Sequence, residues 1–256
     1  MPFIFRSDHS ATLYSSHFTY LTALTSGASA ASSSSSTLPP DYPSALTALN
    51  KLHSTADARG DPDVMNASLV SRLQVLLCAG ARMWNLVPET LERLETSLGL
   101  IFPEPQSSPS KEPPPPLPKP NCTSPLDTHN KLTTLILSSL YHTSLSQPKR
   151  ALQRITLLHT ILDMPESLES FHDGFAVVQM ASGPDLELQV THPRILYEVA
   201  FLVSGLSKRD VTGRKPKRGV YLREGLGVAA EIGKIIGGID SKAVLKSHQL
   251  IWALRL

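Results

Sequence analysis

The chain has 256 residues, of which 24 are Lys or Arg and 22 are Asp or Glu, so its formal net charge is only +2. This balance gives no whole-chain case for nucleic-acid binding, and an aromatic content of 6% is low for stacking on bases. Two cysteines are too few for a disulfide framework, and no apolar run reaches the about 18 residues of a membrane span. Together with an N-terminus that lacks a signal-peptide core, these features predict a soluble intracellular protein.

The first part of the chain divides into a helical fragment over residues 1–25, a serine-rich segment over 26–40 and helical repeats over 41–101. The serine-rich segment cannot bury enough apolar surface to order itself. We therefore expect it to be a disordered linker between helical parts.

Three amphipathic helices are predicted within residues 41–101, over about 41–59, 64–79 and 88–98. Asp41 is a suitable N-cap for the first, and a glycine follows each of the three. The spacing i, i+3, i+4 sets the apolar face of the first helix. That face is Ala45, Leu46, Leu49, Leu52 and Ala56.

Prolines crowd residues 102–126 and favour an extended, exposed backbone, so this segment is predicted to be a disordered linker. A ligand for an SH3- or WW-type groove is the alternative interpretation.

The remainder, residues 127–256, is predicted to form a second set of helical repeats. Asp127 is a candidate cap for a helix that ends near residue 144, and Pro148 begins the next helix, whose apolar face includes Leu152. Segments rich in β-branched and apolar residues flank a Ser-Gly-Pro-Asp turn and predict a short β-hairpin near 174–190. Further helices are expected over about 194–207, with apolar residues through Leu206, and over about 216–236 and 241–256.

The fold class predicted from this pattern is all-α, with about seven to nine helices of similar length stacked as antiparallel pairs into a solenoid. Strict internal self-similarity is poor, because only fragments of a repeat of about 34 residues are visible.

The enzyme motifs in this chain are weak. The G-x-G-x-x-A match at 225–230 lies inside a helical pattern, where small residues favour close helix packing over dinucleotide binding. Residues 213–219 lack the spacing of a phosphate-binding loop, and Ser204-Gly205 lacks a nucleophile elbow. The nine histidines are scattered, without H-E-x-x-H or C-x-x-C spacing. We therefore expect no catalytic, cofactor or metal site.

The strongest local feature is a basic interhelical loop over residues 207–219. A solvated loop, a nuclear-import or nucleic-acid patch, and a cap on helix carbonyls are three competing interpretations. Its charge density makes it the candidate surface for an acidic partner or for DNA. The basic residues, set against the single acid Asp210, are Lys208, Arg209, Arg214, Lys215, Lys217 and Arg218.

Short patterns along residues 41–227 resemble the helical-repeat subunit of the cohesin loading complex in its fungal form. The matching segments are DY at 41–42, ALTAL at 45–49, LH at 52–53, ADARGD at 56–61, LH at 158–159, LD at 162–163, DG at 173–174, FL at 201–202, KRD at 208–210, GRKPK at 213–217 and EGL at 224–226.

The resemblance implies a non-enzymatic nuclear subunit built of tetratricopeptide-like helix pairs, without a cofactor. Such subunits wrap around the extended N-terminal segment of a large HEAT-repeat loader, and the pair places cohesin on chromatin for sister-chromatid cohesion during cell division. The chain matches an internal part of the longer family members. Two alternatives remain open at this stage: a helical domain of a fungal nuclear transcription regulator, and a helical enzyme.

Overall fold

The computed structural model describes residues 41–103, 121–164, 174–178 and 185–207, together with Tyr14, Met180, Val220, Tyr221, Arg223–Gly225 and Gly227. These residues are mostly helical, with one two-stranded antiparallel sheet, as the sequence predicts. Apart from Tyr14, the predicted N-terminal fragment and the serine-rich segment lie outside the described residues.

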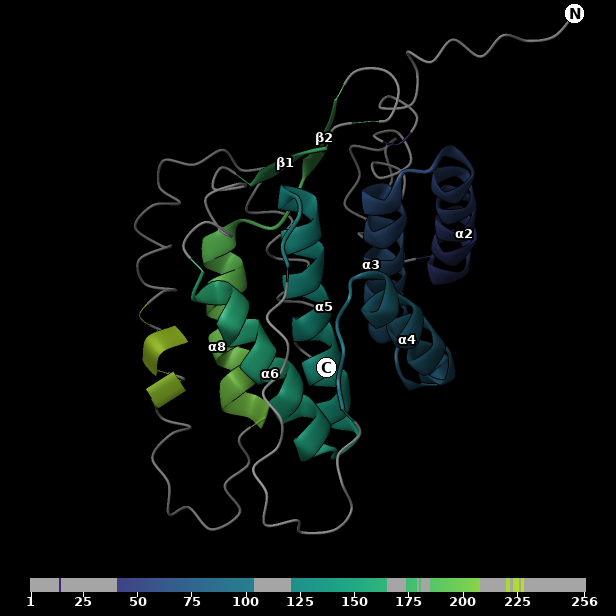
Figure 1. The fold of residues 1–256 in the computed structure, drawn as a ribbon. Coiled ribbons are helices and arrows are strands. Elements are labelled where there is room, and N and C mark those ends of the chain that lie inside the picture. The colour runs from purple at the N-terminus through teal and green to yellow at the C-terminus, as the bar shows by residue number, and fades with distance from the viewer. Residues whose placement is uncertain are drawn as a thin grey trace, which may run out of the picture.

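The three helices predicted in the first set are present (Figure 1): α2 (Tyr42–Arg59), α3 (Pro62–Cys78) and α4 (Val87–Ser97). A 3-10 helix, η2 (Ala81–Leu86), precedes α4 and was not predicted. The Asp41 carboxylate accepts the backbone N–H of Ser44 and caps α2 as predicted. Four of the five predicted apolar positions of α2 are fully buried, and the fifth is half-buried.

The second set comprises α5 (Pro125–Ser144), α6 (Pro148–Leu162), the strands β1 (Phe175–Val178) and β2 (Leu186–Gln189), and α8 (Pro193–Ser207). These elements confirm the predicted helices and hairpin of this part. The two helices predicted beyond residue 215 lie largely outside the described residues, although those described between Val220 and Gly227 are helical.

Helix α5 begins inside the predicted proline-rich linker because its cap is Ser124 and not Asp127. The Ser124 hydroxyl accepts the Asp127 N–H at 3.0 Å, and the Asp127 carboxylate accepts the N–H of Thr123 at 2.9 Å. This reciprocal pair resembles a capping box, in which the third helical residue supports the cap. Pro125 fits the first helical position, where its missing N–H costs nothing.

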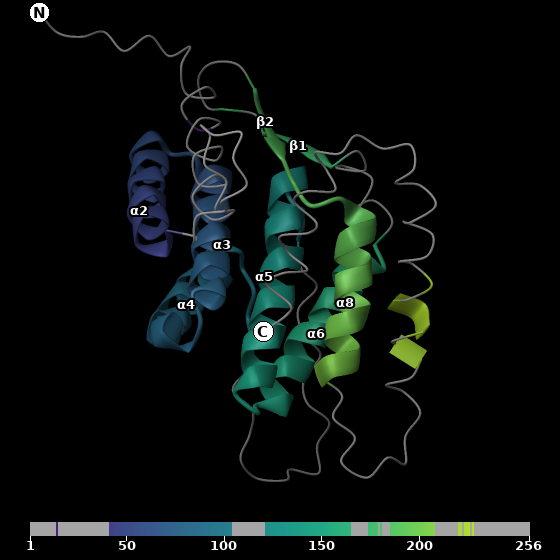
Figure 2. The same cartoon turned by 180° about the vertical axis from the view of Figure 1, so that it is seen from behind.

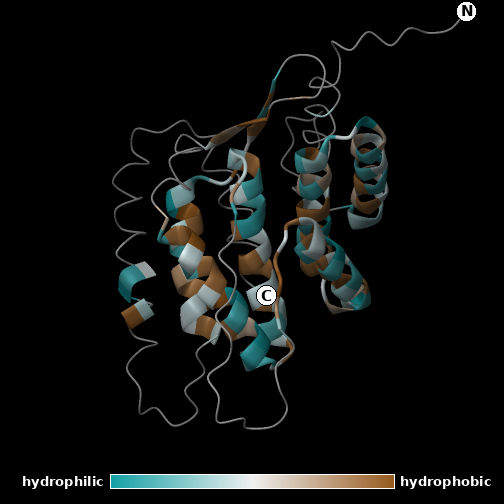
Figure 3. Ribbon diagram, in the orientation of Figure 1, coloured by the Kyte–Doolittle hydropathy of each residue, from teal (hydrophilic) through white to brown (hydrophobic). Residues whose placement is uncertain are grey.

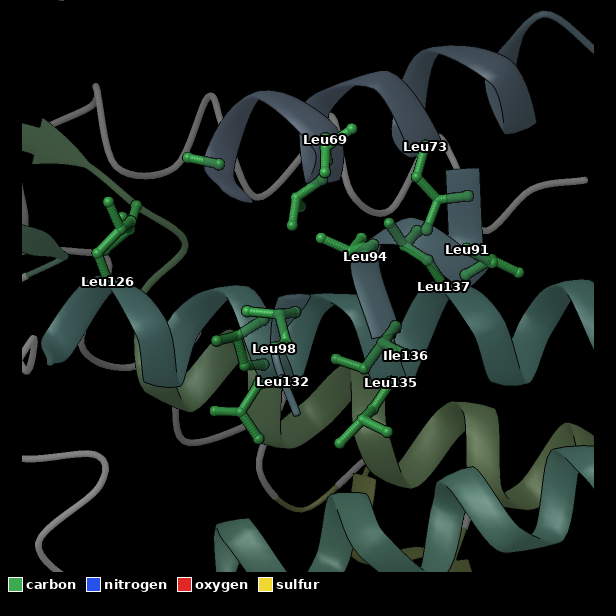
Figure 4. Close-up of a cluster of buried hydrophobic side chains, with 14 of the residues drawn as sticks. Leu69, Leu73, Leu91, Leu94, Leu98, Leu126, Leu132, Leu135, Ile136 and Leu137 are labelled. Atoms are coloured by element: carbon green, nitrogen blue, oxygen red, sulfur yellow. The ribbon is translucent and has the colours of Figure 1, made fainter. Parts of the chain in front are cut away.

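Helix α5 lies at the centre of the molecule (Figures 1 and 2). It packs against α3 on one side and α8 on the other, while α4 packs on α3 and α5, and α6 packs on α5 and α8. Leucines of α3 and α4 meet leucines of α5 in the apolar core that Figure 4 shows. The core is therefore continuous from the first set of helices to the second.

Every side chain of α5 from Leu126 to Ser139 is buried, although Figure 3 shows hydrophilic and hydrophobic stretches along the same helix. Its two buried charges are paired locally: the Lys131 ammonium lies 2.7 Å from the Asp127 carboxylate and also donates to the Asn121 carbonyl. Pairing offsets the cost of removing both charges from water.

A second buried ion pair joins α4 to α6. The Arg154 guanidinium donates from Nε to Glu95 Oε1 at 2.9 Å and from Nη2 to Glu95 Oε2 at 3.0 Å, and it lies 4.2 Å from the centre of the Phe102 ring. Burial raises the pKa of Glu95, against the lowering effect of Arg154. Through these contacts, Arg154 of α6 holds both α4 and the segment that follows it, which contains Phe102.

The hairpin covers one end of α5. Its residues alternate in burial: Ala176 and Val178 face the core, and Phe175 and Val177 are exposed. Beyond the hairpin, the Thr191 N–H donates to His129 Nε2 of α5 at 3.1 Å and ties the start of α8 to the same end.

Gly225 explains the G-x-G-x-x-A pattern. A Cβ atom at this position would lie 3.4 Å from Phe201 Cβ and 3.6 Å from Leu202 Cδ2, both on α8, whereas a Cβ at Gly227 would meet nothing within 4 Å. The described residues before Gly225 are helical and not a strand. The structure thus agrees with the helix-packing interpretation at Gly225 but shows no close packing at Gly227.

We predict that Gly225→Leu lowers the free energy of unfolding relative to Gly227→Leu by about 1–3 kcal/mol, because only the first leucine must displace α8 side chains. Both substitutions gain similar helix propensity, so their difference isolates the packing effect. Urea denaturation followed by circular dichroism measures it. Equal free energies of unfolding for the two variants would contradict the close packing of Gly225 against α8.

Candidate protein-interaction surface

All six residues of the predicted basic surface, Lys208, Arg209, Arg214, Lys215, Lys217 and Arg218, lie outside the described residues. The structure does show where this segment begins. Helix α8 ends at Ser207, whose hydroxyl oxygen lies 2.7 Å from that of Thr143 near the end of α5. The basic segment therefore starts at the end of the molecule formed by the α5–α6 turn.

The α5–α6 turn has a fixed geometry. The imidazole Nδ1 of His142 lies 2.8 Å from the side-chain oxygen of Gln147, and the Gln147 N–H donates to the His142 carbonyl at 2.8 Å. Ser146 adopts a positive φ of 57°, which closes the turn in three residues. This turn leaves the side chain of Leu145 in solvent.

Helix α6 runs antiparallel to α8, since it starts at the turn beside which α8 ends. His159 of α6 faces α8: its Nε2 lies 2.8 Å from the Ser204 hydroxyl, and its ring centre lies 5.6 Å from that of Phe201. Leu152 precedes His159 by seven residues and so shares its face of α6. Because the helices run in opposite directions, Leu152 lies about two turns closer to the α5–α6 turn than His159 does.

Three leucines of these elements are exposed, one each from the turn, α6 and α8. The exposed fractions are 41% for Leu145, 52% for Leu152 and 43% for Leu206. Leu152 and Leu206 lie in the predicted apolar patterns of α6 and α8, but neither side chain belongs to the core.

Acidic residues are absent from two stretches of the sequence near this end. No Asp or Glu occurs between Asp127 and Asp163, nor between Glu198 and Asp210. The sequence analysis identified the basic loop after Ser207 but did not identify Leu145 as exposed. The signal available for Leu145 was an apolar residue within the polar turn Ser-Leu-Ser-Gln-Pro.

Two described hydroxyl–imidazole pairs invite comparison with catalytic dyads. The buried Ser204 donates its hydroxyl proton to the Ala200 carbonyl at 2.7 Å, so His159 donates to Ser204 rather than accepting from it. Ser68 likewise donates to the Met65 carbonyl while facing His53. Neither serine is activated as a nucleophile by its histidine, and both pairs link neighbouring helices.

Over the part of the chain that the structure describes, no group of three or more His, Cys, Asp or Glu side chains could hold a metal ion. None of the described helices combines the length and the apolar character that crossing a bilayer requires. In comparisons with known proteins, no family model, no curated protein and no solved structure matches this chain.

Burial of His142 makes the turn sensitive to acid. Loss of solvent, and then the positive charge of Arg154, lower its pKa from 6.5 to about 4. Since Nδ1 donates to Gln147, the neutral ring presents an unprotonated Nε2 to a buried site. A second proton would add a charge there, so the folded protein holds His142 neutral.

Because the folded pKa lies below the unfolded value, the unfolded chain binds the proton first, and stability is lost as the pH falls from about 6.5 to about 4. This loss amounts to at most about 3 kcal/mol. In His142→Gln, the free energy of unfolding should fall less over the same pH range. Urea titrations of the parent and of the variant at several pH values measure this difference. If the free energies of unfolding of the two proteins fall in parallel with pH, the pKa of His142 is not lowered in the folded protein.

Proposed function

We propose that this protein is a non-enzymatic scaffold subunit that binds the large HEAT-repeat subunit of a cohesin loader. In this role it helps to place cohesin on chromatin for sister-chromatid cohesion, in the nucleus. The observation that carries the proposal is the row formed by α3, α5 and α8, with α4 and α6 packed between its members. The sequence patterns of the cohesin-loader subunit fall mainly on α2, α6 and α8 and on the segment after α8.

The arrangement supports a tetratricopeptide-like solenoid, which is part of the proposal. Short turns join α2 to α3 and α5 to α6 as antiparallel pairs, and the pairs associate side by side through α3 and α5. In solenoids each pair contacts its neighbours and buries a continuous core between them. Solenoids offer extended surfaces that suit a long segment of another chain.

Binding in such a scaffold is passive. Apolar side chains of an extended partner would occupy depressions between helices, and charges around them would speed association and set orientation. In this chain the dense positive charge follows Ser207, so we assign the first contact with an acidic stretch of the partner to the basic loop over residues 207–219.

Affinity purification of the tagged chain from its native cells, followed by mass spectrometry, tests the proposal. Recovery of a HEAT-repeat loader together with cohesin subunits is the expected result. Recovery of a transcription complex instead would favour the helical-regulator alternative, and a catalytic activity in the purified chain would favour the enzyme.

Replacing the six basic residues of the loop by serine should slow association with the purified loader by about tenfold at low salt, because long-range attraction is lost. The dependence of the association rate on salt should flatten at the same time. A matched control is the double variant Lys51→Ser, Arg82→Ser, which removes exposed cations elsewhere on the described surface. Stopped-flow kinetics at several NaCl concentrations measure both effects. If the association rate of the six-residue variant depends on salt as that of the parent does, the loop does not contribute to the interface.

A further inference from the structure

We propose that Asp61 is a two-position switch through which the chain holds and releases its own N-terminal segment. In one position the Asp61 carboxylate accepts the phenol of Tyr14, as in the structure. In the other position it accepts the backbone N–H of Val64 and caps α3. The α2–α3 turn is then a docking site whose occupant is the segment that carries Tyr14. This inference goes beyond the proposed function and does not rest on it.

The contact between Tyr14 and the α2–α3 turn is fully buried. The Tyr14 phenol donates to Asp61 Oδ2 at 2.6 Å, across 47 residues of sequence, and the Arg59 guanidinium lies 5.7 Å from the centre of the ring. Burial, and then the hydrogen bond to Asp61, raise the pKa of Tyr14 to about 12, so the phenol keeps the proton that it donates. The hydrogen bond therefore ties Tyr14 to the turn over the whole physiological pH range.

Asp61 occupies the N-cap position of α3 without capping it. Aspartate is among the best N-cap residues, because its carboxylate can accept an N–H of the first turn, which has no acceptor within the helix. The Asp61 side chain makes no such bond, and its carboxylate accepts the Tyr14 phenol instead. The contact with Tyr14 thus takes from α3 the side-chain cap that α2 has.

Asp41 of α2 shows the second position. Its backbone conformation, φ −95° and ψ 78°, nearly equals that of Asp61, φ −100° and ψ 79°, and a proline follows each aspartate within two residues. The Asp41 carboxylate accepts the N–H of Ser44, three residues further on, at 3.1 Å. Val64 is the equivalent residue of α3. Rotation of the Asp61 side chain alone therefore brings its carboxylate to the capping position.

Hydrogen bonds fix the backbone on both sides of Asp61. Its N–H donates to the Ala56 carbonyl at 3.0 Å, and its carbonyl accepts the N–H of Met65 at 3.0 Å. Breaking a buried contact of a charged group is costly mainly because the charge loses its partner. Here the carboxylate gains the Val64 N–H when Tyr14 leaves, so the turn keeps its shape and the loss is partly offset. The N-terminal segment is therefore held by a contact that is suited to release.

Amide hydrogen exchange of the full chain, followed by NMR, tests the second position. Tyr14→Phe keeps the ring and removes the hydroxyl, so Asp61 should cap α3, and exchange of the Val64 N–H should slow by about fivefold. The double variant Tyr14→Phe, Asp61→Ala has no carboxylate to form the cap and should lose this slowing. An unchanged or faster exchange at Val64 in Tyr14→Phe would overturn the inference, because Asp61 would then serve Tyr14 alone.

Release of the segment is measured by the rate of chymotrypsin cleavage after residue 14, which the enzyme accepts as either Tyr or Phe, with mass spectrometry to identify the site. Tyr14→Phe and Asp61→Ala should each raise this rate at least about tenfold, because a hydrogen bond to a charged group is lost. The matched control Asp41→Ala removes the cap of α2 and should leave the rate unchanged, while exchange of the Ser44 N–H becomes faster. Equal cleavage of Tyr14→Phe and the parent would also overturn the inference, since the hydroxyl would not hold the segment.

Discussion

Enclosure of α5 is the constraint on which the rest of the structure depends. From Leu126 to Ser139 this helix has no exposed side chain, so other elements must surround it on all sides. Helices α3 and α4 supply one side, and α6 and α8 supply the other. The two sets of helices, separated in sequence by the proline-rich segment, therefore share one core and stabilise each other. Several polar side chains of α5 are accommodated because they bond locally, as Thr134 does to the carbonyl of Asn130 at 2.7 Å, whereas the hydroxyls of Thr133 and Ser139 are buried without a hydrogen-bond partner.

This enclosure also marks the boundary of what could be predicted from the sequence. Helices with a clear apolar face, such as α2 with Leu49 and Leu52, were predicted with nearly correct ends, because periodicity and capping are local properties. For α5 the apolar periodicity indicated one buried face, and its Thr, Ser and Asn residues suggested an exposed one. Only the tertiary arrangement buries both. The start of α5 was missed for a related reason, since Asp127 has the right side chain for a cap but supports Ser124 instead.

The candidate site shows the same limit. Charge density in the sequence singled out the six basic residues of the loop over 207–219 as a candidate surface, and since they lie outside the described residues this stays a prediction. Leu152 and Leu206 continue the apolar periodicity of α6 and α8, yet both side chains are exposed. Periodicity shows which side chains share one face of a helix, whereas the tertiary arrangement decides which part of that face another element covers.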